Sequence, residues 1–411
     1  MTCLLRPSPL SGTVSAVPSK SYAHRLLIAA ALSGGRMSFG PSDDAFRTAK
    51  GLCEIGFDAT FEGTSVQFGA FRPSCEERKI RVGESGSTLR FLLPLAAALG
   101  VNAVFVTEGR LGQRPMQALI EALRAHGAET NGTSVTGKLC AGKYLIDATI
   151  SSQYVTGLLM ALPLLEGDSE IVLQGEMVSA PYVNITKEVL GKAGVVVRPT
   201  ENGFLVPGGQ RYALAESRVP GDFSGAAFYL VAGALGSGVT VTGLDVSSAQ
   251  GDKKVLAVIR AVGADVHEDG DRITVARRAL RGFSVDIGDT PDLAPILSVL
   301  AAYAEGESVL CSVGRLRDKE SDRLYAIRDM LTRSGIESRE EGDTLVIRGG
   351  KPKGGVFRSF SDHRMCMAAA VLAAFAEGES SVTEQECVKK SYPTFWEDYR
   401  RVGGTYEVER G

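Results

Sequence analysis

The chain has 411 residues, of which 44% are hydrophobic and 23% are charged, and its formal net charge is −3. These values are typical of a globular protein and exclude a largely disordered chain. They also argue against a nucleic-acid-binding protein, which would show a basic excess over a whole domain. The seven cysteines are scattered without a Cys-x-x-Cys pair, which favours a reducing cytoplasm, and we expect each to be a small buried residue.

The N-terminal residues, Met-Thr-Cys-Leu-Leu-Arg-Pro, show no apolar stretch followed by a cleavage site. No window approaches the ~18 uninterrupted apolar residues of a membrane span. We therefore expect neither export nor membrane insertion. The length predicts two or three domains, at roughly 150 residues each.

One boundary recurs six times along the chain: a helix-like apolar run, a glycine, and then alternating apolar residues. Glycine suits the position that follows a helix, where φ is often positive. The six glycines lie 71, 67, 69, 72 and 68 positions apart, and they are Gly56, Gly127, Gly194, Gly263, Gly335 and Gly403. This spacing predicts an α/β protein built from six repeats of about 70 residues.

A second helix precedes each boundary and opens with polar or acidic residues, as helix N-caps do. The openings lie near Ser19, Glu84, Ser151, Asp222, Asp292 and Asp362. Each helix is followed by a glycine-containing turn and a short strand, so a repeat reads helix, strand, helix, strand, with further strand pieces between repeats. Val219-Pro220-Gly221-Asp222 separates the third repeat from the fourth, and its proline and glycine suit a crossover between two halves.

The reactive side chains concentrate at these helix openings, whose free N–H groups and partial positive charge attract anions. In the first half the openings are rich in hydroxyls: Pro18-Ser19-Lys20-Ser21, Glu84-Ser85-Gly86-Ser87-Thr88 and Ser151-Ser152-Gln153. In the second half Pro291-Asp292 and Ser361-Asp362-His363-Arg364 carry acids and bases. If the repeats pack symmetrically, a cleft between the halves gathers these groups into one anion site.

Each motif also has a simpler structural reading. Taken alone, Lys20 would be a solvated lysine beside a helix N-cap, and Asp292 would be an N-cap residue. The run from Arg317 to Arg323 suits an exposed helix start with intrahelical ion pairs, and Lys389-Lys390 suits the surface. These readings must hold independently at corresponding places of six repeats, so a shared anionic site is the better interpretation.

The ordered motifs resemble those of the 5-enolpyruvylshikimate-3-phosphate (EPSP) synthases, a family of enolpyruvyl transferases, over nearly the whole chain. They are Pro18-Ser19-Lys20-Ser21 with Arg25, Ser85-Gly86-Ser87-Thr88 with Arg90, Gln113-Arg114-Pro115, Ser151-Ser152-Gln153-Tyr154, Ser179-Ala180-Pro181-Tyr182, Pro291-Asp292, Lys319-Glu320-Ser321-Asp322-Arg323, Asp362-His363-Arg364 and Lys390-Ser391-Tyr392-Pro393.

The resemblance implies an α/β fold of two domains, each with three βαβαββ repeats, joined by two crossing strands (the inside-out α/β barrel of enolpyruvyl transferases). Residues 1–18 and 220–411 would form the domain that carries the acid and base on the phosphoenolpyruvate side. Residues 19–219 would form the domain on the shikimate-3-phosphate side.

The resemblance also implies residue roles. The catalytic residues would be Asp292, Glu320 and Lys20. Shikimate-3-phosphate would be held by Lys20, Ser21, Arg25, Ser151, Ser152, Gln153, Ser179, Tyr182, Asp292 and Lys319. Phosphoenolpyruvate would be held by Lys20, Gly86, Arg114, Gln153, Arg323, Arg364 and Lys390. Supporting residues would be Ser87, Arg90 and His363.

The implied reaction adds the 5-hydroxyl of shikimate-3-phosphate to C2 of phosphoenolpyruvate and then eliminates phosphate, on the route to chorismate and the aromatic amino acids. Asp292 would serve the hydroxyl and Glu320 the methylene carbon. The resemblance implies no metal or organic cofactor, no nucleic-acid or membrane partner, a cytoplasmic monomer, and glyphosate as an inhibitor.

Three positions depart from the family pattern: Glu84 and Arg315 stand where asparagine is common, and Ser87 stands where threonine is commoner. A glutamate beside an anion site either repels phosphoenolpyruvate or pairs with a nearby arginine. Gly86 leaves room beside that site, which favours sensitivity to glyphosate.

Two alternatives stay open. A UDP-N-acetylglucosamine enolpyruvyl transferase shares the fold, but its members typically have Lys-Asn where this chain has Lys20-Ser21, and often a reactive cysteine near the position of Arg114. A non-catalytic relative that only binds anions is the second alternative, and the presence of Asp292 and Glu320 argues against it.

Overall fold

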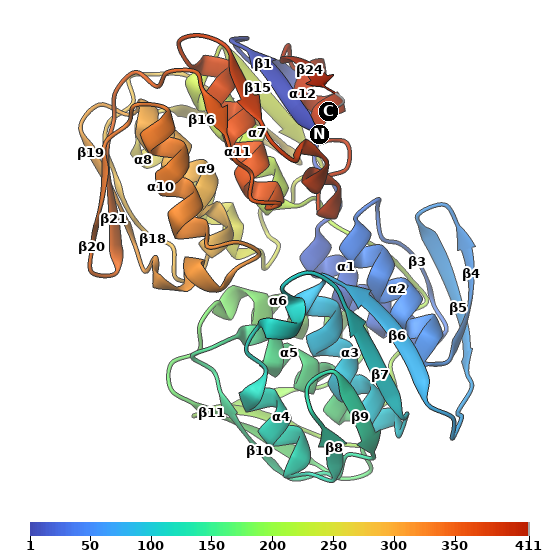
Figure 1. Cartoon of the computed structure of the whole chain (residues 1–411). Helices are drawn as coiled ribbons and strands as arrows, with labels where there is room; N and C mark the ends of the chain where they lie inside the picture. Colours follow the sequence, from blue (N-terminus) through green and yellow to red (C-terminus); the bar gives the residue numbers. More distant parts are fainter. Residues whose placement is uncertain (410–411) are drawn as a thin grey trace. The chain divides into compact units, whose positions relative to one another are not determined.

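The computed structural model describes residues 1–409, and the chain divides into two compact units. Lys20–Val219 forms one of them, which we call the inserted unit (blue to green in Figure 1). Met1–Ser19 and Pro220–Gly411 together form the other, which we call the split unit. The chain thus begins in the split unit, passes through the inserted unit and returns.

Three four-stranded sheets and six α-helices make up the inserted unit. The helices are α1 (Lys20–Ser33), α2 (Asp43–Ile55), α3 (Gly86–Leu99), α4 (Gln117–Arg124), α5 (Ser152–Ala161) and α6 (Ala180–Lys192), with 3-10 turns η1 (Leu111–Gln113) and η2 (Leu162–Leu164). The sheets, in spatial order, are β14 (Glu216–Arg218), β3 (Arg36–Ser38), β5 (Ser65–Phe71), β4 (Phe57–Glu62); β6 (Arg78–Gly83), β7 (Ala103–Thr107), β9 (Ser134–Gly137), β8 (Ala128–Thr130); and β10 (Lys143–Asp147), β11 (Ser169–Gln174), β13 (Gly203–Val206), β12 (Arg198–Thr200).

In its described residues, 1–19 and 220–409, the split unit repeats this plan with three sheets and six α-helices. The helices are α7 (Phe223–Leu235), α8 (Lys254–Ala261), α9 (Ala294–Tyr303), α10 (Arg323–Arg333), α11 (His363–Phe375) and α12 (Phe395–Arg401), with 3-10 turns η3 (Gly251–Lys253), η4 (Pro291–Leu293), η5 (Gly314–Asp318) and η6 (Gln385–Lys390). The sheets are β2 (Ser11–Ser15), β15 (Gly238–Thr242), β17 (Arg272–Ala276), β16 (Asp265–Asp269); β18 (Ser284–Asp286), β19 (Glu307–Cys311), β21 (Thr344–Arg348), β20 (Ser338–Glu341); and β22 (Val356–Phe357), β23 (Ser380–Val382), β1 (Thr2–Arg6), β24 (Thr405–Glu409).

All six sheets share one pairing pattern: the first two strands are parallel and the other pairs are antiparallel. With a helix after each of the first two strands, this is the βαβαββ repeat, and the predicted α/β class is confirmed. Strand β1 closes the last sheet of the split unit by pairing with β23 and β24, and Figure 1 shows it beside β24.

The six predicted boundary glycines follow the second helix of each repeat, and all have positive φ. The values are 134° at Gly56, 93° at Gly127, 74° at Gly194, 102° at Gly263, 75° at Gly335 and 97° at Gly403. An L-residue rarely adopts this conformation, so the glycines end the helices and turn the chain into the following strands.

The first helix of each repeat is apolar nearly all round, which is typical of a helix in a core. In the split unit all 13 residues of α7 are buried, and α7, α9 and α11 contact one another. In the inserted unit α1, α3 and α5 are buried along most of their length. The starts of these six helices carry most of the predicted site residues.

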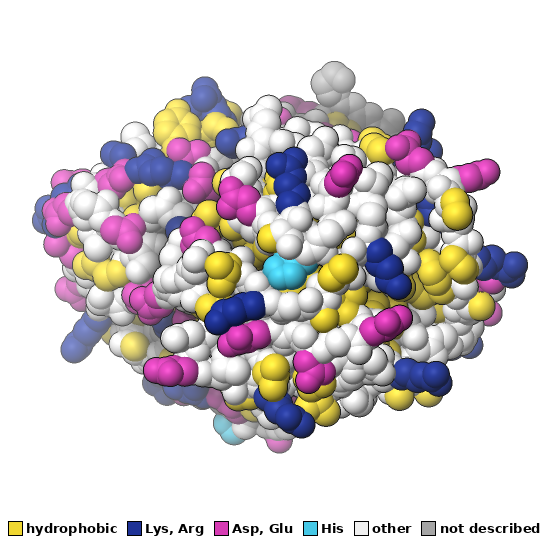
Figure 2. All heavy atoms as spheres, turned by 90° about the horizontal axis from the view of Figure 1, so that it is seen from below, with side chains coloured by type: hydrophobic (Ala, Val, Ile, Leu, Met, Phe, Trp, Pro, Cys, Tyr) yellow, Lys and Arg dark blue, Asp and Glu magenta, His cyan; other side chains and the backbone are white. Residues whose placement is uncertain are grey.

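Two expectations about the surface can be checked. In residues 1–409 no helix combines the length and apolar character that crossing a membrane requires. All seven cysteines are free thiols, but the expectation that each is buried is wrong for Cys75 and Cys140, which lie exposed in loops. On the face in Figure 2, basic and acidic side chains alternate around scattered hydrophobic ones.

Candidate active site

The start of α1 carries the first predicted group, Lys20 and Ser21. The ammonium group of Lys20 lies 2.8 Å from Asp44 Oδ2, at the start of α2, and the two side chains are only 19% and 10% exposed. The simpler reading of a solvated lysine is therefore wrong. Asp44 holds Lys20 in place and balances part of its charge.

Arg25, one turn further along α1, is 2% exposed. Its guanidinium donates to Thr186 Oγ1 at 2.7 Å, Ser21 O at 2.6 Å, Tyr182 O at 3.0 Å and Thr156 Oγ1 at 3.2 Å. Among residues 1–409 no carboxylate lies within ion-pair distance of it. Burial lowers the pKa of Arg25 because the neighbours supply dipoles rather than a negative charge. The inserted unit thus holds a buried cation with no protein counter-ion.

A chain of polar groups links the starts of α3 and α5. The amide of Gln153 donates to Ser87 Oγ at 3.0 Å and accepts from Arg90 at 2.7 Å. Arg90 also donates to the carbonyl of Pro115 at 2.9 Å. The structure therefore brings together Gln153, predicted to bind substrate, and the predicted supporting residues Ser87 and Arg90.

Gly86, the first residue of α3, lies against the guanidinium of Arg114. A Cβ atom at Gly86 would meet Arg114 NH1 at 2.8 Å, closer than real Cβ contacts allow. The Nε atom of Arg114 is buried and has no hydrogen-bond partner among the described residues. The carboxylate of Glu84, one of the departures from the family pattern, lies over Gly109, where a Cβ atom would not fit.

The starts of α5 and α6 carry the other predicted site residues of the inserted unit that have hydroxyl groups. Ser151 caps α5 by accepting from the N–H of Gln153 at 3.3 Å, and Ser152 follows it, 4% exposed. Ser179 precedes α6 in the left-handed region with φ 56°, which a non-glycine residue adopts only at a cost. Tyr182 lies one turn into α6, where its carbonyl accepts from Arg25.

In the split unit, Arg323 lies at the centre of the predicted acids and bases and is 1% exposed. Its three nitrogens each contact a different carboxylate at 2.7 Å: Asp292 Oδ1, Glu320 Oε2 and Asp362 Oδ2. Asp292 and Glu320 come from one repeat, where they precede α9 and α10, and Asp362 comes from the next repeat, where it precedes α11. One guanidinium therefore fixes both predicted catalytic acids, Asp292 and Glu320, relative to each other.

Asp292 also contacts a second arginine, since its Oδ2 lies 2.8 Å from Arg364 NH2. Burial alone would raise the pKa of Asp292, but Arg364, Arg323 and Lys319 outweigh burial and hold it well below its ordinary value. The pKa of Lys319 is also lowered, to about 8, by burial and by Arg323 and Arg315 nearby, although Asp292 opposes the change. The predicted bases and cations of the split unit are thus coupled to one another.

His363 and Lys390 complete the predicted set. His363 is the first residue of α11 and 1% exposed, with Nδ1 3.9 Å from Asp362 Oδ1. Lys390 ends η6 and is half-buried. Residues 1–409 contain no group of three or more His, Cys, Asp or Glu side chains arranged to hold a metal ion.

Comparison with known proteins decides the family. A family model for EPSP synthase (3-phosphoshikimate 1-carboxyvinyltransferase) matches residues 5–399. A 3-phosphoshikimate 1-carboxyvinyltransferase of Clostridium kluyveri is 39% identical over 97% of both chains, and one of Methanothrix thermoacetophila is 38% identical over 96% of this chain and 97% of its own.

This chain belongs to the EPSP synthase family. The structure of an EPSP synthase from Acinetobacter baumannii covers all of both chains with a TM-score of 0.85 and 25% identity. The enolpyruvyl transferase NikO from Streptomyces tendae has the same fold, with a TM-score of 0.79 over 99% of this chain at 16% identity. The resemblance to the EPSP synthase family and the predicted fold class are thus confirmed.

Several residues that contact the predicted site residues were not selected from the sequence. Asp44, Thr156 and Thr186 were not singled out, and Asp362 was quoted in a motif but given no role. A buried acid or hydroxyl in the first turn of a helix is a usable signal, but any N-cap gives the same one. A residue of this kind differs from an ordinary N-cap residue in the partner that it contacts on another element. The order of residues along the chain does not show that partner directly.

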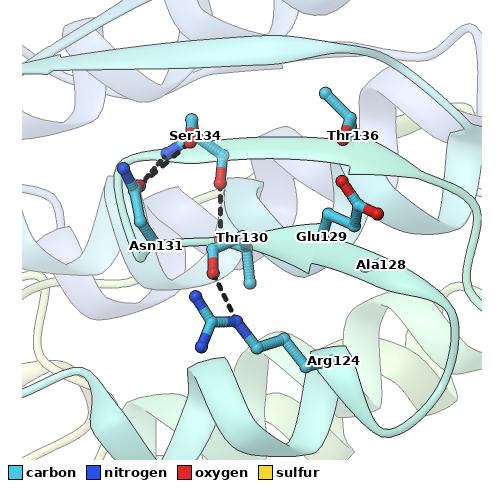
Figure 3. A pocket seen from close by; sticks show the side chains of 7 residues that line it. All are labelled: Arg124, Ala128, Glu129, Thr130, Asn131, Ser134 and Thr136. Carbon is cyan, nitrogen blue, oxygen red and sulfur yellow. Dashed lines mark hydrogen bonds between the residues drawn. The ribbon is translucent and has the colours of Figure 1, made fainter.

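The pockets that the structure shows within each unit lie elsewhere. One of about 470 Å³ adjoins the β8–β9 hairpin, where Arg124 Nε donates to the carbonyl of Thr130 at 2.7 Å (Figure 3). Another of about 730 Å³, in the split unit, is lined by the C-terminal ends of α7, α9 and α11. None of the predicted site residues lines either pocket.

Proposed function

We propose that this protein transfers the enolpyruvyl group of phosphoenolpyruvate to the 5-hydroxyl of shikimate-3-phosphate and releases phosphate. Membership of the EPSP synthase family along residues 5–399 supports this assignment. The structural observation that carries it is the Arg323 guanidinium, which holds Asp292 and Glu320 at 2.7 Å each. A proton acceptor and a proton donor fixed by one cation suit an addition that needs both.

In the addition, the 5-hydroxyl oxygen forms a bond to C2 of phosphoenolpyruvate and its proton passes to Asp292. The C2–C3 double bond opens and C3 takes a proton from Glu320, which gives a tetrahedral ketal phosphate. In the elimination, the bond from C2 to the phosphate oxygen breaks, C3 returns a proton to Glu320 and the C2–C3 double bond re-forms. The departing phosphate takes up the proton that Asp292 accepted, which restores the Asp292 carboxylate. Lys20 belongs to the same proton network. The mechanism requires no metal or organic cofactor.

Substrate charge explains how Asp292 serves as a base although Arg364, Arg323 and Lys319 depress its pKa. A bound carboxylate or phosphate competes for the same guanidinium groups, because arginine pairs with all of these anions. As the arginines turn to the substrate, the positive charge that stabilises the ionised Asp292 weakens. The pKa of Asp292 then rises toward its ordinary range, where a carboxylate accepts a proton more readily.

The substrate contacts follow the resemblance residue by residue. Shikimate-3-phosphate is held by Lys20, Ser21, Arg25, Ser151, Ser152, Gln153, Ser179, Tyr182, Asp292 and Lys319. Phosphoenolpyruvate is held by Lys20, Gly86, Arg114, Gln153, Arg323, Arg364 and Lys390, with Ser87, Arg90 and His363 in support. The buried Arg25 without a carboxylate and the partnerless Nε of Arg114 support anion binding in the inserted unit.

We further propose that residues 1–18 with 220–411 form the domain of acid–base chemistry and 19–219 the domain that binds shikimate-3-phosphate. The protein acts in the cytoplasm as a monomer, and its seven free thiols suit a reducing compartment. Glyphosate inhibits it, because Gly86 keeps space beside Arg114 open.

The test follows inorganic phosphate from purified protein supplied with phosphoenolpyruvate and shikimate-3-phosphate, with each substrate alone as a control. Release that needs both substrates supports the proposal, and Asp292→Asn or Glu320→Gln lowers the rate by about 100-fold or more. Release with UDP-N-acetylglucosamine in place of shikimate-3-phosphate contradicts it. Binding of shikimate-3-phosphate without any release favours a non-catalytic relative.

A further inference from the structure

One buried acid in the split unit has no place in the mechanism above. Asp252 lies in η3 and is 5% exposed. Its Oδ2 accepts a hydrogen bond from the hydroxyl of Ser224, and its Oδ1 is buried with no hydrogen-bond partner among the described residues. An ionised carboxylate with one oxygen in this state is costly, whereas a neutral carboxylic acid costs less.

The segment that carries Asp252 is fixed to the start of α7. The side chain of Gln250 accepts from the N–H of Phe223 at 3.0 Å and donates to the carbonyl of Gly221 at 2.8 Å. Helix α7 in turn packs against η4, which carries Asp292, and against α11, which carries Arg364. The turn that carries Asp252 and the elements that carry Asp292 and Arg364 thus all pack on the same helix, α7.

The charges around Asp252 come from each neighbouring element. Burial raises its pKa to about 7, Asp292 and Asp222 act in the same direction, and Arg364 and the Ser224 hydroxyl oppose them. Lys253, on the same turn, points its ammonium group at the carbonyls of Val246 and Ser248, at 3.0 and 2.8 Å. Asp252 thus gains its charge near neutral pH, within the field of Asp292 and Arg364.

We propose that Asp252 is a positioning residue that sets how strongly Asp292 accepts the substrate proton. The proposal rests on the function proposed above, and Asp252 itself touches no substrate and forms no bond. When Asp252 is neutral, Arg364 and Arg323 keep Asp292 a weak base. When Asp252 is ionised, its negative charge disfavours a second one on Asp292 and competes for Arg364, so Asp292 takes the hydroxyl proton more readily.

The first test is the pH profile of kcat for wild type, Asp252→Asn and Ser224→Ala. In wild type kcat rises with pH through an inflection near pH 7, in addition to any from the substrate phosphates. Asp252→Asn lacks this inflection and is about three- to tenfold slower at pH 8, since its neutral amide cannot strengthen the base. Ser224→Ala moves the inflection to higher pH, because the Ser224 hydroxyl favours the ionised carboxylate.

The matched control is Asp398→Asn, a buried carboxyl on α12 that bonds to Thr394 and Arg401. It leaves the inflection in place. An inflection that persists unchanged in Asp252→Asn overturns the proposal. If Asp252→Asn does not fold, Ser224→Ala decides: an unchanged inflection in that variant overturns the proposal equally.

A second readout does not depend on activity. A carboxyl whose folded pKa is raised stabilises the fold at low pH and loses that contribution as pH rises toward the folded value. The urea midpoint of wild type therefore falls relative to that of Asp252→Asn between about pH 4 and pH 7. Parallel midpoints would overturn the inference. Absence of phosphate release in wild type would instead refute the proposed function.

Discussion

Arg25 and Arg323 are both buried arginines near the start of a helix, but their surroundings differ. Arg323 contacts three carboxylates at 2.7 Å, so the protein supplies more negative charge than one guanidinium balances. Arg25 donates only to hydroxyls and carbonyls. The guanidinium of Arg25 is therefore not balanced by a carboxylate and can pair with a bound anion. Arg323 is already paired with carboxylates, which a bound anion must displace.

The largest effect is expected from breaking the carboxylate cluster with Arg323→Met. Asp292, Glu320 and Asp362 would be left without their shared cation, which costs about 3–5 kcal/mol in the free energy of unfolding. Urea denaturation measures it. The control is Arg339→Met, whose exposed pairs with Glu307 and Glu341 are screened by solvent, and it shifts the midpoint little. Equal losses in both variants would contradict the difference between buried and exposed pairs.

Arg25→Met tests the other half of the comparison and should affect binding more than stability. The affinity for shikimate-3-phosphate is expected to fall by about 10- to 100-fold, as for the loss of a charged hydrogen bond. Titration calorimetry measures it. Thr156→Val, which removes one acceptor of Arg25 and keeps the charge, should weaken binding less. If Arg25→Met left the affinity unchanged, the unbalanced positive charge of Arg25 would have no role in binding.

The smallest of the three effects is expected from Gly86→Ala. Its methyl group displaces Arg114 NH1, which lies 2.8 Å from the added Cβ, so the KM for phosphoenolpyruvate should rise by about tenfold through misplacement of one guanidinium. Gly191→Ala is the matched control, because a Cβ there meets nothing within 4 Å and helix α6 gains a better helix former. A KM that stays constant in Gly86→Ala would show that Arg114 adapts without loss.

Much of this architecture could be predicted from local chemistry. The glycines after the helices and the capping groups Ser85, Ser151, Asp222 and Asp362 act within a few residues, so the sequence displays them. The partners of Arg323 are different, because Asp292 and Asp362 lie 31 and 39 positions away and meet it only once the elements that carry them have packed together. The pairing of Lys20 with Asp44 and the burial of Asp252 depend on packing in the same way.

The pairing of β1 with β24 has a consequence for synthesis. Every strand partner of the inserted unit has been made by Arg218, whereas β1 and β2 must wait for β15, β23 and β24. At a translation rate of roughly 5–20 residues per second, the inserted unit has about 10–40 s to fold before the last strand appears. The inserted unit can therefore fold first, and the split unit closes only after β24 has been made, when β1 finds its last partner.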